Sequence, residues 1–284
     1  MVSRGRTSSI GLELPSDTEE ILRRLVLGLP QALKGNLVGL YLRGSLATGD
    51  FSSATSDLDL LAVTEQPVSK AEFAALAALH AELAGSSNPY ANRIEIAYVD
   101  RGALEKYEPG LRHPTLYEGE ALRWEEHRTN WILERWSLRE QGVALLGPDP
   151  EALIEPVSRR QVREAVIARL QDWADWANQP DDPDWSLPLA HKRYVVETMC
   201  RALHTLACGE LAGKHHAAEW ASVNLPAPWR STVERSRAWQ GDASPSAEIV
   251  KDVRQFVLWA AADGVHWADN LQDAVGDPSG CARM

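Results

Sequence analysis

Two kinds of hydrophobic spacing divide the chain. In the first half, short apolar runs of strand length stand between stretches with helical spacing, whereas after Pro156 nearly every segment repeats its apolar residues at helical intervals. Strands and helices in one half and helices alone in the other predict an α+β fold. We expect an N-terminal domain over residues 1–150, a mixed sheet with flanking helices, and a C-terminal all-α helical bundle over residues 151–284.

The first half contains four short apolar runs that turn residues bound, as is typical of strands. The leading helix carries a predicted capping box, with Ser16 as cap and Glu19 three residues later. In chain order, we predict a helix over 17–33, a strand over 37–42, a polar loop over 46–56, a strand over 57–63, a helix over 70–84, a strand over 93–99, an irregular stretch over 110–126, a helix over 129–141 and a short strand over 142–148.

The second half shows only helical spacing, interrupted by proline, glycine and aspartate. We predict helices near residues 159–177, 189–208, 215–223, 228–239 and 247–268, followed by a loose tail from Gln272. No repeat or low-complexity block appears.

The net charge predicts which partners the protein binds, and the apolar runs predict where it is located. The 284 residues include 29 Lys and Arg against 40 Asp and Glu, a net charge of −11. That balance disfavours nucleic acid, which needs clustered positive charge, and suits a cationic small molecule. No apolar run is long enough for a membrane span and no secretory signal is written at the N-terminus, so we expect a cytoplasmic monomer.

A pair of aspartates opens the second predicted strand. Asp57 and Asp59 are two residues apart, so in a strand both carboxylates project to one side while Leu58 and Leu60 point into the core. Two adjacent carboxylates repel one another unless a cation lies between them, and such oxygen ligands suit Mg²⁺ held jointly with phosphates. The alternative is a solvated acidic pair on an edge strand.

Two further features surround this pair. Gly44 and Ser45 follow the first predicted strand, where glycine permits close backbone approach and a serine hydroxyl can donate to a phosphate oxygen. Glu95 lies within the third strand between two isoleucines, a costly position for a carboxylate without a partner. A strand, Gly-Ser, an eleven-residue loop, Asp-x-Asp and this third acid together resemble the nucleotidyltransferase superfamily that includes DNA polymerase beta.

The resemblance narrows along the chain. The segments Arg139 to Pro148, Arg193 to Arg201, Gly209 to Lys214 and Ala217 to Ala221 resemble the aminoglycoside nucleotidyltransferases that modify streptomycin and spectinomycin. This resemblance covers most of residues 20 to 260. It implies a Mg²⁺-dependent enzyme that transfers AMP from ATP to a hydroxyl of an aminoglycoside or aminocyclitol, releases pyrophosphate and confers resistance.

The same resemblance implies binding residues in both halves. Arg201 and Lys214 would contact the triphosphate, as would Gly44 and Ser45. For the acceptor, the resemblance implies the following residues: Trp124, Asp184, Trp185 and His191. The chain departs from the family at His191, where enzymes that accept streptomycin carry an aspartate. With Lys192 beside it, a cationic neighbourhood would repel a guanidinium group, so spectinomycin is favoured over streptomycin.

The three acids define a mechanism and its rivals. Asp57 and Asp59 would bind Mg²⁺ against the triphosphate, and Glu95 would accept the proton of the attacking hydroxyl or act as a third metal ligand. The sequence leaves open a different small metabolite as acceptor, and a nucleotide-sensing binding module without catalysis. Transfer to protein or RNA is less favoured, because the helical half shows no basic groove.

Overall fold

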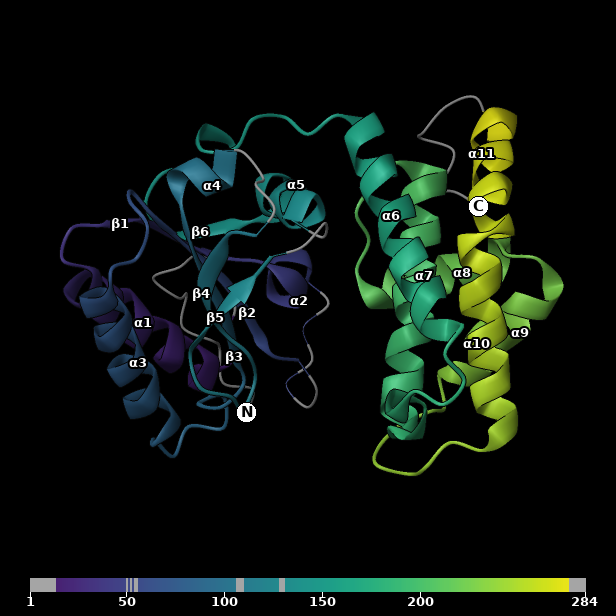
Figure 1. The fold of residues 1–284 in the computed structure, drawn as a ribbon, viewed down its shortest axis with the longest axis horizontal. Helices are drawn as coiled ribbons and strands as arrows, with labels where there is room; N and C mark the ends of the chain where they lie inside the picture. Colours follow the sequence, from purple (N-terminus) through teal and green to yellow (C-terminus); the bar gives the residue numbers. More distant parts are fainter. Residues whose placement is uncertain are drawn as a thin grey trace, which may run out of the picture. The chain divides into compact units, whose positions relative to one another are not determined.

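The computed structural model divides the chain into two compact units, Met1–Val157 and Ser158–Met284 (Figure 1). It describes residues 14–49, 51, 53, 56–105, 110–127 and 131–275, the side chains of 270–275 excepted. The unit boundary falls seven residues after the expected one.

A six-stranded mixed sheet forms the centre of the first unit, in the order β5-β4-β3-β2-β1-β6. The strands are β1 (Leu37–Leu42), β2 (Leu58–Thr64), β3 (Ile94–Asp100), β4 (Arg112–Leu116), β5 (Arg123–Glu126) and β6 (Val143–Leu146). Only the pair β2 and β3 is parallel among these, and the connection between them contains helix α3 (Lys70–Ala84). A parallel pair requires such a crossover, because a tight turn can join only antiparallel neighbours.

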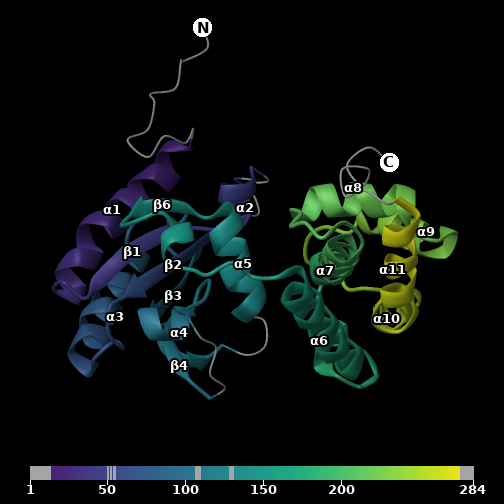
Figure 2. The ribbon, with the colours of Figure 1, turned by 90° about the horizontal axis from the view of Figure 1, so that it is seen from above.

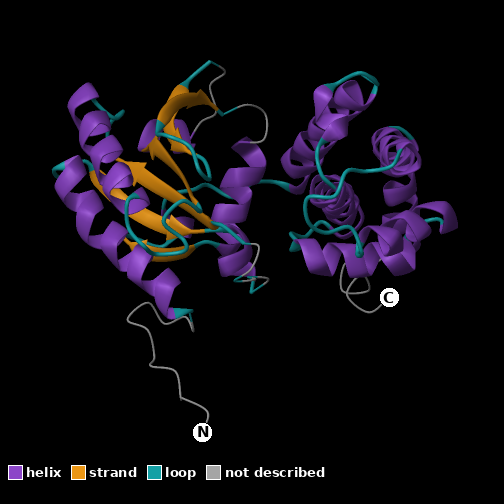
Figure 3. Cartoon of the chain, turned by 90° about the horizontal axis from the view of Figure 1, so that it is seen from below, coloured by secondary structure: helices purple, strands orange, loops and turns teal. Residues whose placement is uncertain are grey.

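Helices flank both faces of this sheet. The other helices of the unit are α1 (Ser16–Leu33), α2 (Gly44–Thr48), α4 (Arg101–Glu105), α5 (Trp131–Gln141) and the 3₁₀ turn η1 (Pro150–Ala152). In Figures 2 and 3, α1 and α3 lie on one side of the sheet, and α5 lies on the other. Leu22, Leu25 and Leu29 of α1 are fully buried, because their spacing places them on one helical face.

Alternation along β2 and β3 gives the sheet two different faces. Leu58, Leu60, Ile94 and Ile96 are at most 1% exposed and share one core cluster with α1 and α3. We call this side the apolar face. Asp59 and Glu95 point to the opposite side, which we call the acid face. Farther along the strands, the acid face is apolar too, where it packs on α4 and α5.

The second unit is helical throughout its regular elements. Its members are α6 (Arg159–Ala177), the 3₁₀ turn η2 (Pro183–Ser186), α7 (Leu189–Cys208), α8 (Lys214–Asn224), α9 (Ala227–Ser236), α10 (Ala247–Ala261) and α11 (Asp263–Val275). Helix α7 contacts each of the other five α-helices and provides the fully buried Val195, Val196 and Met199. Within the described part of the chain, we find no helix with the length and apolar character that a membrane crossing requires.

The predicted capping box of the first helix is wrong. Pro15, not Ser16, caps α1, and no side chain caps that end. Ser16 is already the first helical residue, so its hydroxyl stands one position too late for a capping box. Complete capping boxes occur instead at Ser69 and Ser158, ahead of α3 and α6. There the serine backbone is extended and the side chain accepts from the third helical N–H.

Three other stretches also differ from the prediction. Residues 110–126 form the β4–β5 hairpin, whose alternation is hidden by Pro114 and Gly119 and which is held by antiparallel pairing on β3. The start of the loop after β1 is the short helix α2. The last predicted helix is two helices, α10 and α11, which break at Ala262, and the second continues to Val275 beyond the expected start of the loose tail.

Candidate functional site

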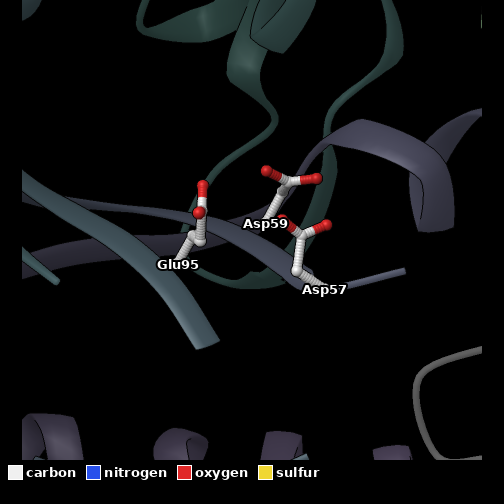
Figure 4. Close-up of side chains that lie close together, drawn as sticks. All are labelled: Asp57, Asp59 and Glu95. Carbon is white, nitrogen blue, oxygen red and sulfur yellow. The ribbon is translucent and has the colours of Figure 1, made fainter. Parts of the chain in front are cut away.

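Three carboxylates meet at one end of the parallel strand pair. Asp59 is in register with Glu95 on the neighbouring strand, and Asp57 lies just before β2. Figure 4 shows their side chains rising from the strands to the same side. One oxygen from each lies within 4.8 Å of the others. Each residue is neither fully buried nor fully exposed, so the cluster is open to a ligand from solvent.

Glycine is required where Asp59 lies against the chain. Gly44 has a φ of +63°, and a Cβ on it would stand 1.9 Å from Oδ2 of Asp59. Any other residue would therefore displace that carboxylate and adopt a strained backbone. The Arg43 N–H donates to the carbonyl of Asp59 at 3.0 Å, which ties this turn to β2.

Arg93 holds the segment that leads to Asp57. Its guanidinium donates to the carbonyls of Ser53, at 3.0 Å, and of Ser56. It also lies 5.0 Å from the ring centre of Tyr90. The Arg93 carbonyl accepts from the Leu58 N–H at 2.8 Å. Backbone and side chain of one residue on the β3 side thus fix the entry of β2 and the position of Asp57.

The acid cluster raises the pKa of Glu95 to about 7. Burial is the main cause, because it disfavours the charged form, and the charges of Asp57 and Asp59 add to it. Arg43 and a backbone hydrogen bond from Glu118 act in the opposite direction. A carboxylate with a pKa near neutrality is suited to accept a proton.

The donor set fits a hard divalent cation. Carboxylate oxygens are the ligands that Mg²⁺ prefers, and three of them converge here from a rigid strand pair. Besides burial, the negative charges of Asp57 and Asp59 raise the pKa of Glu95, because the three carboxylates repel one another. A divalent ion would relieve this repulsion, so Asp57, Asp59 and Glu95 are the residues that would hold it.

An arginine beside the acids escaped the sequence prediction. Arg43 ends the turn after β1, and its side chain is 21% exposed. Its guanidinium pairs with Glu134 of α5, whose side chain is 26% exposed. The charges of Glu134, Asp59, Glu95 and Asp57 all raise the pKa of Arg43, against the effect of burial. In the sequence, Arg43 stands directly before Gly44-Ser45. Its partner Glu134 lies 91 residues away, so no local pattern predicts the pair.

Ser45 lies in the first turn of α2. Its hydroxyl oxygen is buried, and none of the residues that the structure describes offers it a hydrogen bond. A buried hydroxyl without a partner is costly, so a ligand atom would satisfy it. The contact of Ser45 with a phosphate stays a prediction, and the unpartnered hydroxyl is consistent with it.

The predicted acceptor residue Trp124 lies on the wrong face of the sheet. Its ring stacks on Phe73 of α3 at 5.5 Å between centroids, and it packs against the core of the apolar face. Glu95 points to the other side, so Trp124 is a packing residue. This packing is the alternative that the sequence left open for Trp124, and the β4–β5 hairpin sets the direction of its side chain.

Tyr117 is the aromatic residue near the acids. Tyr117 follows β4 and is 37% exposed. The backbone N–H of the next residue, Glu118, donates to the Glu95 carboxylate. The pKa of Tyr117 is raised, mainly by burial and then by Glu125, with Glu95 contributing. Arg123 lies 5.0 Å from the ring centre. No local pattern marks Tyr117, because only the hairpin fold brings it beside Glu95.

Arg201 and Lys214 lie on the second unit and are exposed. The Arg201 Nε donates to the carbonyl of Ala212 at 3.2 Å, which holds the end of α7 against the segment before α8. The ammonium of Lys214 lies 5.5 Å from the ring centre of Tyr194. Both side chains are open to solvent, and they have donors for which the described residues supply no hydrogen-bond partner.

The residues expected around the acceptor fall into two groups. Trp185 is 5% exposed and stacks on Trp176 with ring centres 3.9 Å apart, so it belongs to the core of the helical unit. Asp184 is exposed, and His191 is partly exposed with a buried Nδ1 for which the described residues supply no partner. Asp184 and His191 therefore remain available to a ligand.

Lys192, the cation expected beside His191, is held away from solvent. Lys192 is fully buried, and its ammonium donates to the carbonyls of Asp184, at 2.8 Å, and Leu187, at 3.2 Å. Burial and the charge of Lys192 lower the pKa of His191, so its imidazole is neutral at neutral pH. At His191 the chain therefore differs from the streptomycin-accepting enzymes by the absence of a carboxylate.

Comparison with known proteins finds sequence similarity to aminoglycoside adenylyltransferases. A profile of the aminoglycoside adenylyltransferase C-terminal domain matches residues 152–262. An aminoglycoside (3'') (9) adenylyltransferase of Klebsiella pneumoniae is 32% identical over 126 residues, 44% of this chain and 45% of that protein. The match thus spans less than half the length of that relative.

Two further proteins match over greater lengths. A spectinomycin 9-adenylyltransferase of Campylobacter jejuni is 24% identical over 77% of this chain and 84% of its own length. The crystal structure of spectinomycin adenyltransferase AAD(9) from Enterococcus faecialis, with ATP and spectinomycin, covers 87% of this chain and 98% of that one, with a TM-score of 0.67 and 18% identity. That structural likeness shows a common fold. Along most of its length the chain is therefore similar, in sequence and in fold, to aminoglycoside nucleotidyltransferases.

Proposed function

We propose that this protein transfers AMP from ATP to a hydroxyl group of an aminocyclitol or aminoglycoside and releases pyrophosphate. The observation that carries this proposal is the convergence of Asp57, Asp59 and Glu95 on adjacent parallel strands of a chain similar to this family. Each acid has a neighbour that fixes it, and the three oxygens are close enough to share one cation. An acidic cluster of this kind has no evident value for stability, because its charges repel.

The residues of the first unit have different proposed roles in the reaction. Asp57 and Asp59 are proposed to bind Mg²⁺, which would supply charge neutralisation at the phosphates. Glu95 accepts the proton of the attacking hydroxyl, since burial and its two acidic neighbours hold its pKa at about 7. The unpartnered hydroxyl of Ser45 donates to a phosphate oxygen. Whether Glu95 also binds the metal does not change the proton transfer, because both roles need its ionised form.

The second unit is proposed to add positive charge at the triphosphate. Arg201 and Lys214 are exposed cations with donors not used by the fold. A transferring phosphoryl group carries charge over several oxygens, so additional cations stabilise it. Replacing either residue with glutamine should raise the KM for ATP more than the KM for the acceptor.

The acceptor is proposed to be spectinomycin in preference to streptomycin. Relatives that align over 77% and 78% of this chain are spectinomycin 9-adenylyltransferases. At position 191 a neutral imidazole replaces a carboxylate, so a guanidinium group would lack its counter-ion there. We further propose Tyr117 as the aromatic contact of the acceptor, in place of Trp124, because its partly exposed ring lies on the Glu95 side of the sheet.

One experiment tests the activity and the acceptor together. The purified protein is incubated with ATP and Mg²⁺ and, separately, with spectinomycin and streptomycin. Product mass and pyrophosphate are measured, with Asp59→Asn as the inactive control. We expect adenylylated spectinomycin, little or no streptomycin product, and no product from the control. An equal yield of both products would contradict the proposed preference, and full activity of the control would contradict the proposed site.

A further inference from the structure

The pair formed by Arg43 and Glu134 lies beside the acid cluster. Arg43 directly precedes Gly44, the residue on which the Asp59 carboxylate lies. Its backbone N–H donates to the Asp59 carbonyl, and its side chain leaves the turn toward α5. A guanidinium in this position interacts electrostatically with all three carboxylates and with Glu134. Arg43 is therefore a fixed cation at the edge of the site where a metal ion would bind.

Glu134 controls how much of that positive charge the acid cluster experiences. The Arg43 and Glu134 side chains are 21% and 26% exposed, so water screens their interaction only in part. The ion pair directs the guanidinium toward α5 and largely cancels its charge. Without Glu134, the guanidinium would be an uncompensated cation next to carboxylates that it can bind. Without Arg43, the acid cluster would lose the neighbouring cation that opposes binding of a metal ion.

We propose that the Arg43–Glu134 ion pair sets the affinity of the acid cluster for its divalent cation. Arg43 opposes the binding of the cation, and Glu134 limits that opposition. Both are positioning residues. This inference rests on the proposed function, because it takes Asp57, Asp59 and Glu95 as the metal site. It also explains a buried ion pair at this place, since such pairs contribute little net stability.

The proposal predicts effects of opposite sign for the two partners. Glu134→Gln should weaken binding of the cation about fivefold, because an unpaired positive charge remains near the site. Arg43→Gln should strengthen it by a similar factor, because only negative charge remains. The double variant should bind within about twofold of the unaltered protein, because both charges are absent. A merely structural role would instead weaken binding in all three variants.

The test uses Mn²⁺ alone as the probe, without nucleotide, at pH 8 and low ionic strength. Electron paramagnetic resonance measures free Mn²⁺ for the full-length protein and each variant. Asp59→Asn shows whether the measured site is the acid cluster. Arg43→Lys retains the charge and should bind within twofold of the unaltered protein. Thermal unfolding of each variant confirms that the compared chains are folded.

The possible outcomes separate the two proposals. Opposite shifts with a restored double variant support the role of the ion pair. Weaker binding in every variant, or Arg43→Lys behaving like Arg43→Gln, would overturn it while leaving the metal site intact. If Mn²⁺ binding is absent, or unaffected by Asp59→Asn, the proposed metal site is wrong, and the inference is wrong with it.

Discussion

The two faces of the β2–β3 strand pair have different physical roles. On the apolar face, Leu60 and Ile96 are at most 1% exposed and pack with α1 and α3. On the acid face, one residue earlier in each strand, Asp59 and Glu95 hold charges that repel each other. The same backbone therefore carries stabilising and destabilising side chains in alternation. The apolar face makes the strands rigid, and this rigidity keeps the acids close.

This contrast predicts that substitutions on the two faces affect different quantities. On the acid face, activity should fall while stability is kept or rises. On the apolar face, stability should fall while the activity of the folded fraction is kept. Four substitutions test that separation.

Asp59→Asn should lower kcat/KM for adenylyl transfer roughly a thousandfold, because it removes a central ligand of the proposed cation. The melting temperature should not fall, since one of three repelling charges is lost. Steady-state release of pyrophosphate and thermal unfolding measure the two quantities. Asp242→Asn, on an exposed loop of the other unit, is the matched control and should change neither. A large loss of stability in Asp59→Asn would break the separation.

Leu60→Ala should lower the free energy of unfolding by about 3 kcal/mol, because it leaves a cavity in a fully buried cluster. Chemical denaturation measures this loss. The kcat/KM of the protein that remains folded should stay within about threefold of the unaltered value. Leu27→Ala is the control, since Leu27 is 56% exposed. A loss of activity that exceeds the unfolded fraction would show that the apolar face also shapes the site.

Glu95→Gln should stabilise the metal-free protein at pH 8 by about 1–2 kcal/mol. The folded pKa of Glu95, about 7, lies above the ordinary value of 4.5, so its stabilising contribution is complete below pH 4.5 and is lost as pH rises through 7. Glutamine stays neutral and avoids that loss. Denaturation at pH 5 and pH 8 should show a gain only at the higher pH. An equal gain at both would indicate a cause other than ionisation.

Tyr117→Ala should raise the KM for the acceptor about tenfold and change the KM for ATP little, because it removes an aromatic surface beside Glu95. Tyr117→Phe keeps the ring and should stay within about threefold for both substrates. Trp124→Phe, on the opposite face, should leave both KM values unchanged. If Trp124→Phe weakens acceptor binding and Tyr117→Ala does not, the assignment of the two aromatics must be exchanged.

Local sequence patterns predicted part of the candidate site. Asp57 and Asp59 on one side of a strand, and Glu95 between Ile94 and Ile96, follow from the two-residue period of a strand. The α+β class and the family resemblance follow from spacing and motifs, and the comparisons confirm both. The strand β3 register opposite β2 was not readable, because pairing depends on partners that are distant in sequence.

Sequence alone thus determined the residue types of the acid cluster, the strand and helix periods that carry them, and the family resemblance. Tertiary structure decided the rest. It packed Trp124 on the apolar face, buried Lys192 against backbone carbonyls, and joined Arg43 to Glu134 across 91 residues. The physical reason is the range of the forces involved. Periodicity and capping act between near neighbours, whereas burial and ion pairing depend on which distant segments pack together.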